Sequence, residues 1–162
     1  RLAKCPVITI KGKEHRIGCK NIILPLDLEK ETKEKVTYAL EYARYWDATV
    51  RVVSVLLQDN NLVREKLIKN INQVTDFILK AGVNCTSELV EGEKKQTLGD
   101  FVFEYSMNFD ADLIIIMTKK EELSFSNNIS ETARYIINNS EIPVMSVKPK
   151  ESKYISPPTT AF

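Results

Sequence analysis

The sequence has only five glycines in 162 residues, and none of them lies after Gly99. This shortage matters at residues 112–133, which follow the pattern of an apolar strand, a polar loop and the start of a helix. In many nucleotide-binding α/β proteins such a loop holds phosphate, and glycine lets its backbone N–H groups approach the ligand. The sequence therefore raises the question of whether a phosphate binds here or the site has been filled.

Other scarce features exclude further classes of protein. The single histidine, His15, lies in a basic segment without a cysteine or carboxylate pattern, so we expect no metal site. Cys5, Cys19 and Cys85 are scattered and odd in number, which predicts reduced thiols in a cytoplasmic protein. Apolar runs of about five residues fall far short of the roughly 20 that span a bilayer. The net charge of +1 favours neither nucleic acid nor an anionic membrane as a partner.

Residues that could carry out catalysis are also missing. No Ser-His-Asp or Cys-His set can form, because the only histidine lies in the basic segment. The carboxylates are numerous, but no motif brings two of them together. We therefore expect no enzyme activity.

The hydrophobic pattern predicts strands and helices in alternation. Residues 21–27 form a short apolar run that ends in Pro25 and Asp27, as a buried strand does. Apolar residues then recur at helical spacing, with Glu31, Glu34 and the neighbouring lysines on the other face. The inward positions of this helix are Val36, Leu40, Ala43 and Trp46.

The alternation continues to residue 148. Further strands are predicted at residues 49–57, 83–92, 113–117 and 142–148, and further helices around residues 59–82, 97–108 and 130–139. The strand at 83–92 alternates in polarity, which suits a sheet edge, whereas the strand at 113–117 is the most apolar and so central. This order predicts a doubly wound α/β fold, with a five-stranded parallel sheet and helices on both faces.

The first residues resemble the end of the predicted domain. Residues 6–13, PVITIKGK, match residues 143–150, PVMSVKPK, and the two prolines are separated by one domain length. We interpret residues 1–20 as the last strand of a preceding repeat plus a linker. Residues 21–150 form the domain, and residues 151–162 are expected to be a flexible tail.

In ordered combination, these elements resemble the universal stress protein family. The resemblance rests on NIILPLD at 21–27, AGV at 81–83, VEG at 90–92, DADLIIIMT at 110–118 and INNSEIPVMSV at 137–147. It implies a strand order of three-two-one-four-five. It also implies pairing through the fifth strand, residues 143–148, in a homodimer or in a pseudo-dimer with residues 6–10 of a tandem chain.

The resemblance also indicates where a nucleotide would bind. ATP-binding members carry an aspartate after the first strand and a loop with three glycines after the fourth. Carried over by position, the candidate binding residues are Pro25, Leu26, Asp27, Val55, Met117, Thr118, Lys119, Ser130 and Glu131. The glycines are absent here, and Ser130 and Glu131 stand near the end of the motif. Side chains at such positions block close backbone approach to phosphate.

Two hypotheses follow from this departure. The first is a stress-linked regulatory or interaction module that binds no ATP through the glycine motif and has no cofactor. The alternative is a sensor that binds a nucleotide or small anion between the first and fourth strands by other contacts. A loop side chain such as Phe125 filling the crevice would favour the first, and an inward Lys119 the second.

Overall fold

The computed structural model describes residues 5–12, 17–27, 32–57, 59–92, 96–118 and 131–148. Its elements alternate along the chain as the sequence predicts. They are β1 (Val7–Thr9), β2 (Asn21–Pro25), α1 (Thr32–Trp46), β3 (Thr49–Leu56), α2 (Asn61–Lys80), β4 (Cys85–Glu91), α3 (Leu98–Asn108), β5 (Leu113–Met117), α4 (Glu131–Asn139) and β6 (Val144–Val147). The predicted tail at 151–162 lies outside the described residues. None of the helices described is both long and apolar enough to cross a membrane.

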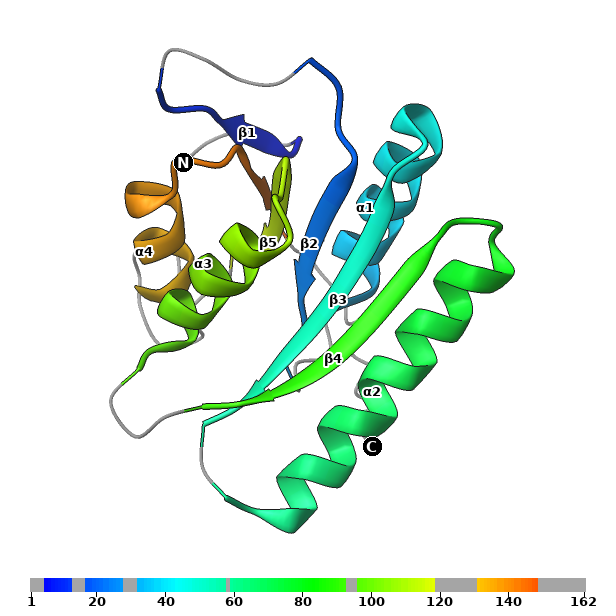
Figure 1. Cartoon of the computed structure of the whole chain (residues 1–162), viewed down its shortest axis with the longest axis vertical. Coiled ribbons are helices and arrows are strands. Elements are labelled where there is room, and N and C mark those ends of the chain that lie inside the picture. Colours follow the sequence, from blue (N-terminus) through cyan, green and yellow to red (C-terminus); the bar gives the residue numbers. More distant parts are fainter. Residues whose placement is uncertain are drawn as a thin grey trace, which may run out of the picture.

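The strands form one six-stranded sheet in the order β1-β6-β5-β2-β3-β4 (Figure 1). Neighbours from β6 to β4 are parallel, and β1 is antiparallel to β6. If the strands are numbered from residue 21, β2 is the first and β6 is the fifth. Read from β4, the order is then the predicted three-two-one-four-five, and β1 is an extra strand beside the fifth. The predictions of a central strand at β5 and an edge strand at β4 are confirmed, and so is the α/β fold class.

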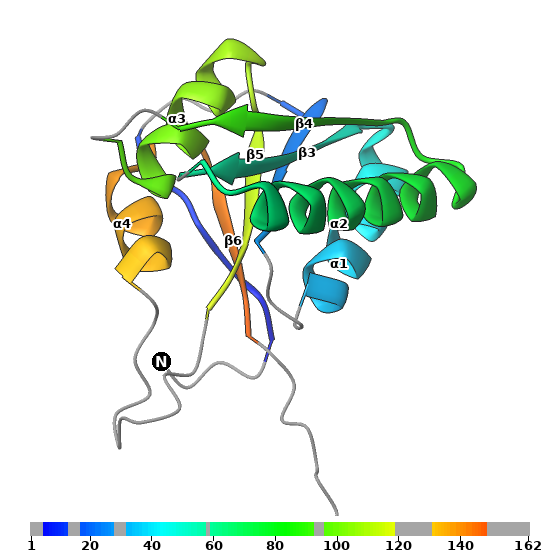
Figure 2. The ribbon, with the colours of Figure 1, turned by 90° about the horizontal axis from the view of Figure 1, so that it is seen from below.

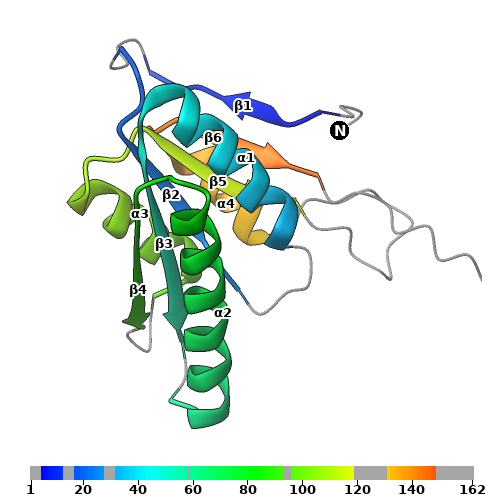
Figure 3. The ribbon, with the colours of Figure 1, turned by 90° about the vertical axis from the view of Figure 1, so that its right-hand side faces the viewer.

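The helices cover both faces of the sheet, so that two cores form. Helices α1 and α2 pack on one face, where the core includes Ile22, Val52 and Ile115. Helices α3 and α4 pack on the other face over Ile23 and Ile114. Figure 2, along the sheet, shows the helix pairs on opposite sides, and Figure 3 shows α1 and α2 on the near side. Because strand side chains alternate, both faces of the central strands are apolar.

Local signals set the helix ends. The Asn60 side chain accepts hydrogen bonds from the N–H groups of Leu62 and Val63 and so caps α2. Gly82 follows α2 with φ of +77°, as predicted for a glycine after a helix. The prediction that Trp46 faces the core is wrong, since 39% of it is exposed. It is the last residue of α1, and the chain turns away at Asp47, where φ is +52°.

The pairing of β1 with β6 has an internal symmetry. The register joins Val7 to Ser146, Ile8 to Met145 and Thr9 to Val144. In the sequence repeat, residues 7, 8 and 9 correspond to residues 144, 145 and 146. Equivalent residues, Ile8 and Met145, therefore face each other, and the flanking pairs exchange places. This is the register that two copies of one strand adopt around a two-fold axis.

Candidate functional site

The candidate site is a crevice at the carboxyl ends of β2 and β5. At this point the chain order reverses, because β3 lies on one side of β2 and β5 on the other. Ligands of doubly wound sheets bind in such crevices. The cavity here has a volume of about 250 Å³. The strands contribute Pro25, Leu26, Asp27, Ile116 and Met117, and the helices contribute Lys35, Leu98, Val102, Thr132, Ala133 and Ile136.

Lys35 is the functional residue that sequence reasoning missed. It was grouped with the lysines of the exposed face of α1, but only 4% of it is exposed. Its ammonium group donates a hydrogen bond of 2.7 Å to the backbone carbonyl of Pro25. Burial lowers the pKa of Lys35, and the nearby Asp27 carboxylate opposes that change. A cationic side chain of the protein therefore lies in the crevice beside Asp27, which is the carboxylate that lines it among the described residues.

A signal for this burial was present in the sequence. Lys35 lies four residues before Ala39, which is fully buried, and so shares its helix face. A lysine on that face reaches the carbonyl at the end of β2 and donates a hydrogen bond to it.

The backbone at the end of β2 is held from inside the protein. The Leu26 N–H donates to the Val53 carbonyl at 2.7 Å, and the Ser54 hydroxyl donates to the Leu26 carbonyl at 2.9 Å. The Asn70 side chain of α2 donates to the Asp27 carbonyl at 2.8 Å. These groups fix the position of Asp27, and they leave fewer backbone groups for a ligand.

The remaining predicted site residues do not all gather here. Thr118 is directed to β6, since its N–H and its hydroxyl both donate to the Val147 carbonyl, at 2.8 and 3.2 Å. Val55 lies in a different groove, beside α3. Glu131 begins α4 and lines a separate depression with Thr97 and Tyr135. Lys119, Ser130 and Phe125 lie outside the described residues.

The N-terminus of α4, whose residues Thr132 and Ala133 line the crevice, differs from the helix N-terminus of an open phosphate site. The first turn of α4 carries Glu131, whose negative charge complements the positive end of the helix dipole. In a phosphate site that end of the helix binds the ligand instead. Within the residues that the structure describes, no group of three His, Cys, Asp or Glu side chains is placed to hold a metal ion.

Comparisons with known proteins agree with the predicted family. The model of the universal stress protein family matches residues 18–148. A search of curated proteins finds no match. Two similar solved structures are complexes with a nucleotide. One is a universal stress protein from Archaeoglobus fulgidus in complex with dAMP, which is 20% identical with a TM-score of 0.65, over 81% of this chain and 98% of that one. The other is a universal stress protein in complex with cAMP, which is 13% identical with a TM-score of 0.67, over 83% of this chain and 100% of that one.

A third similar structure is longer than this chain. It is a universal stress protein from Archaeoglobus fulgidus DSM 4304, 15% identical with a TM-score of 0.71. The match covers 90% of this chain but only 50% of the other. At these identities the structures establish a shared fold.

Proposed function

Because the chain belongs to the universal stress protein family, we propose that it is a stress-linked regulatory and interaction module that does not hold ATP through the family's glycine motif. The observation that carries this proposal is the position of Lys35. Its side chain lies in the crevice where a nucleotide would enter, and it is bonded to the Pro25 carbonyl. The protein's own amine thus takes up space and hydrogen-bonding capacity that a ligand would need.

The size and chemistry of the crevice support the same proposal. Its volume of about 250 Å³ is below the roughly 300–1,000 Å³ of typical small-molecule sites. No glycine follows Gly99, so a glycine-rich phosphate loop after β5 cannot form. We propose no cofactor and no catalytic role. The free thiols of Cys5, Cys19 and Cys85 suit a cytoplasmic protein.

A nucleotide or small-anion sensor is the second candidate. The dAMP and cAMP complexes of similar proteins favour it, and so does a buried cation beside the crevice. In this alternative Lys35 would leave the Pro25 carbonyl and bind a phosphate oxygen. The contacts would involve Asp27 and Met117 and, from the loop outside the described residues, Lys119 and Ser130.

A thermal-shift titration with ATP, ADP, AMP and cAMP, each with Mg²⁺, separates these candidates. A ligand at one hundred times its Kd stabilises the folded state by about 2.7 kcal/mol, which raises Tm by several degrees. The proposal expects no change in Tm at millimolar nucleotide. A shift that disappears in both Asp27→Ala and Lys35→Met, but persists in the exposed control Glu65→Gln, would establish the sensor instead.

We also propose that residues 1–10 are the closing strand of a preceding copy of the domain. The symmetric register of β1 on β6 supports this proposal, as does the similar structure of twice the length. In this arrangement β1 takes the place that the fifth strand of a second domain has in a dimer. An edge strand with unpaired N–H and C=O groups needs such a partner.

A further inference from the structure

The outer edge of β4 is an open strand edge. β4 ends the sheet, and among the described residues no strand lies on its outer side (Figure 1). It pairs with β3 without interruption over seven residues, Cys85–Glu91. Proteins usually protect such an edge with a bulge, a proline or a very short strand. The opposite edge strand, β1, has three residues, whereas β4 has seven and carries neither a bulge nor a proline; its charged residues are Glu88 and Glu91.

The backbone groups that β4 presents can be assigned. The Val50 N–H donates to the Asn84 carbonyl, and the Gly92 N–H donates to the Leu56 carbonyl, both at 2.9 Å. The backbone N–H and C=O groups of even-numbered residues of β4 therefore point toward β3 and form hydrogen bonds with it. Because the direction of these groups alternates along a strand, those of odd-numbered residues point outward. The outward N–H and C=O groups belong to Cys85, Ser87, Leu89 and Glu91.

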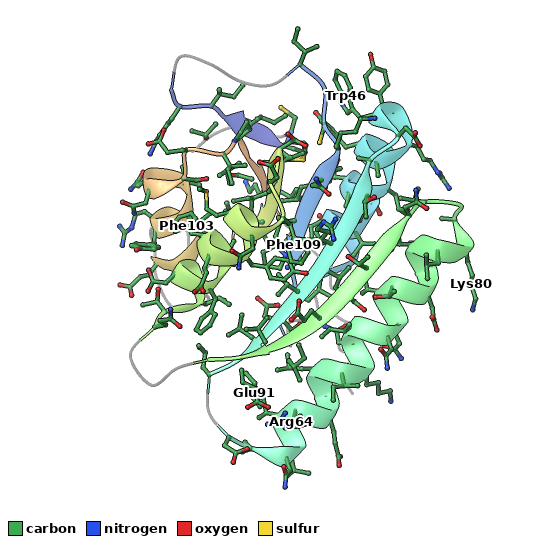
Figure 4. The ribbon with its side chains drawn as sticks, in the orientation of Figure 1. Trp46, Arg64, Lys80, Glu91, Phe103 and Phe109 are labelled. Atoms are coloured by element: carbon green, nitrogen blue, oxygen red, sulfur yellow. The ribbon has the colours of Figure 1, made fainter. Side chains whose placement is uncertain are left out.

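A groove runs beside this edge on the face that carries α3. The even-numbered side chains Thr86, Glu88 and Val90 face it, because Glu88 and Val90 line it together with residues of α3. Its volume is about 270 Å³. Apolar side chains form most of the surface, and they are Val53, Val55, Val90, Phe101, Tyr105 and Phe109. Figure 4 shows Phe109 over β3, next to the strand that forms the edge.

Two carboxylates line the groove. Glu88 and Glu104 both line it, and neither forms an ion pair within the described residues. Burial raises the pKa of Tyr105 to about 12, and the nearby Glu88 carboxylate adds to this rise. Arg51 lies 4.3 Å from the centre of the Phe109 ring, and its guanidinium group donates hydrogen bonds to Asn21 and to Thr86 of β4.

Full-length antiparallel pairing of β4 with a second copy of the chain is unfavourable. Antiparallel pairing of two β4 strands over their full length would place Glu88 directly opposite the Glu88 of the other copy. Like charges in directly opposed positions destabilise a strand pair. The charge instead suits a partner strand with a cation at that position.

We propose that β4 binds an extended segment of a partner protein by strand addition. The segment carries a lysine or arginine beside Glu88, and two residues away it carries an apolar side chain that enters the groove over Val90. Outward N–H and C=O groups of β4 supply the affinity, and the side-chain pockets supply the specificity. This inference rests on the proposed interaction role and names the class of partner.

Peptides arrayed on cellulose and probed with the full chain test the proposal. Each nonapeptide alternates valine and threonine and carries lysine, alanine or glutamate at its centre. We expect the lysine peptide to bind about tenfold more strongly than the glutamate peptide, because a like charge at the interface is repelled. The substitution Glu88→Lys should reverse this order, and the control Glu65→Lys, on exposed surface of α2, should leave it unchanged.

The substitution Ser87→Pro tests the backbone contact. Proline removes an outward N–H while the bonds to β3, made by even-numbered residues, remain. We expect Ser87→Pro to abolish peptide binding and Ser87→Ala to retain it, with circular dichroism checking the fold of each variant. If Ser87→Pro does not fold, the charge reversal in Glu88→Lys still decides the proposal.

Three results would overturn the inference. The first is equal binding of the lysine and glutamate peptides. The second is unchanged binding in a folded Ser87→Pro. The third is a dimer of the free chain in which hydrogen exchange shows protected amides at Ser87 and Leu89, which would assign the edge to a second copy. The nucleotide titration concerns a different site, so either proposal can fail without the other.

Discussion

At the scale of single residues, the buried Lys35 has the clearest consequence for stability. Its pKa is lowered in the folded protein by burial, and Asp27 is the charged group that faces it in the crevice. Between its folded and unfolded pKa values, the unfolded chain binds more protons than the folded chain. The free energy of unfolding therefore rises with pH in the alkaline range below about 10.4, the unperturbed lysine value.

We predict that Lys35→Met removes this alkaline rise. The free energy of unfolding of wild type minus that of the variant should increase as the pH is raised from 7 toward 10. Urea denaturation at pH 7, 8.5 and 9.5 measures the difference, and other titrating groups contribute equally to both proteins. Parallel pH profiles for the two proteins would contradict the burial of an ionisable Lys35.

Gly99 gives a second prediction at this scale. A Cβ at this position would lie 2.4 Å from Cδ1 of Tyr135, whose ring packs on the first turn of α3. Gly99→Ala should therefore destabilise the protein by about 1–3 kcal/mol, as overpacking does. In a Tyr135→Ala background the clash is gone, and the helix preference of alanine should make the same change neutral or stabilising by up to about 1 kcal/mol. Equal effects of Gly99→Ala in both backgrounds would refute this account.

The sequence predicted part of the candidate site. The family resemblance placed Pro25, Leu26, Asp27 and Met117 at the candidate site, and all four line the crevice, because parallel strands bring their carboxyl ends to one edge. Lys35 was missed because a charged residue on an amphipathic helix is usually exposed. Its position four residues before Ala39 was one signal, but its burial depends on a tertiary contact with the Pro25 carbonyl, ten residues away, which helix periodicity does not reveal.

At the scale of elements, we predict that Asn60, the N-cap of α2, contributes more to the free energy of unfolding than the neighbouring Asn61. Asn60 satisfies two N–H groups of the first turn, at 3.0 and 3.2 Å. Asn60→Ala should lower the free energy of unfolding by about 1 kcal/mol. The matched change Asn61→Ala, one residue inside the helix, should cost less. Chemical denaturation measures both, and equal losses would contradict the capping role.

The elements themselves were predicted well, because long periodic segments carry strong signals. The strand at β5 and the helix at α2 have unbroken apolar patterns, and their positions agree with the structure. The predicted strand at 83–92 extends beyond both ends of β4, since pattern does not show where pairing with β3 stops. The edge position of β4 was predicted from its alternating polarity, but the acidic groove beside it emerges only when α3 is placed across the sheet.

At the scale of the whole molecule, the pairing of β1 with β6 predicts an effect on assembly. If β1 takes the place of a second domain's strand, removing residues 1–10 exposes the edge of β6. We predict that the truncated chain forms a dimer through antiparallel β6 strands. The chain that retains β1 should contain a larger fraction of monomer at the same concentration. Light scattering after size exclusion measures both masses. A truncated chain that stays monomeric at high concentration would contradict this role for β1.

The most direct measurement for the whole account is an amide NMR titration of the chain with ATP and Mg²⁺. The account predicts that the amides of Leu26, Asp27 and Met117 stay unshifted at millimolar ATP, because Lys35 occupies the crevice. Saturable shifts at these three amides, absent in Asp27→Ala, would contradict it and would establish a nucleotide site that needs no glycine loop.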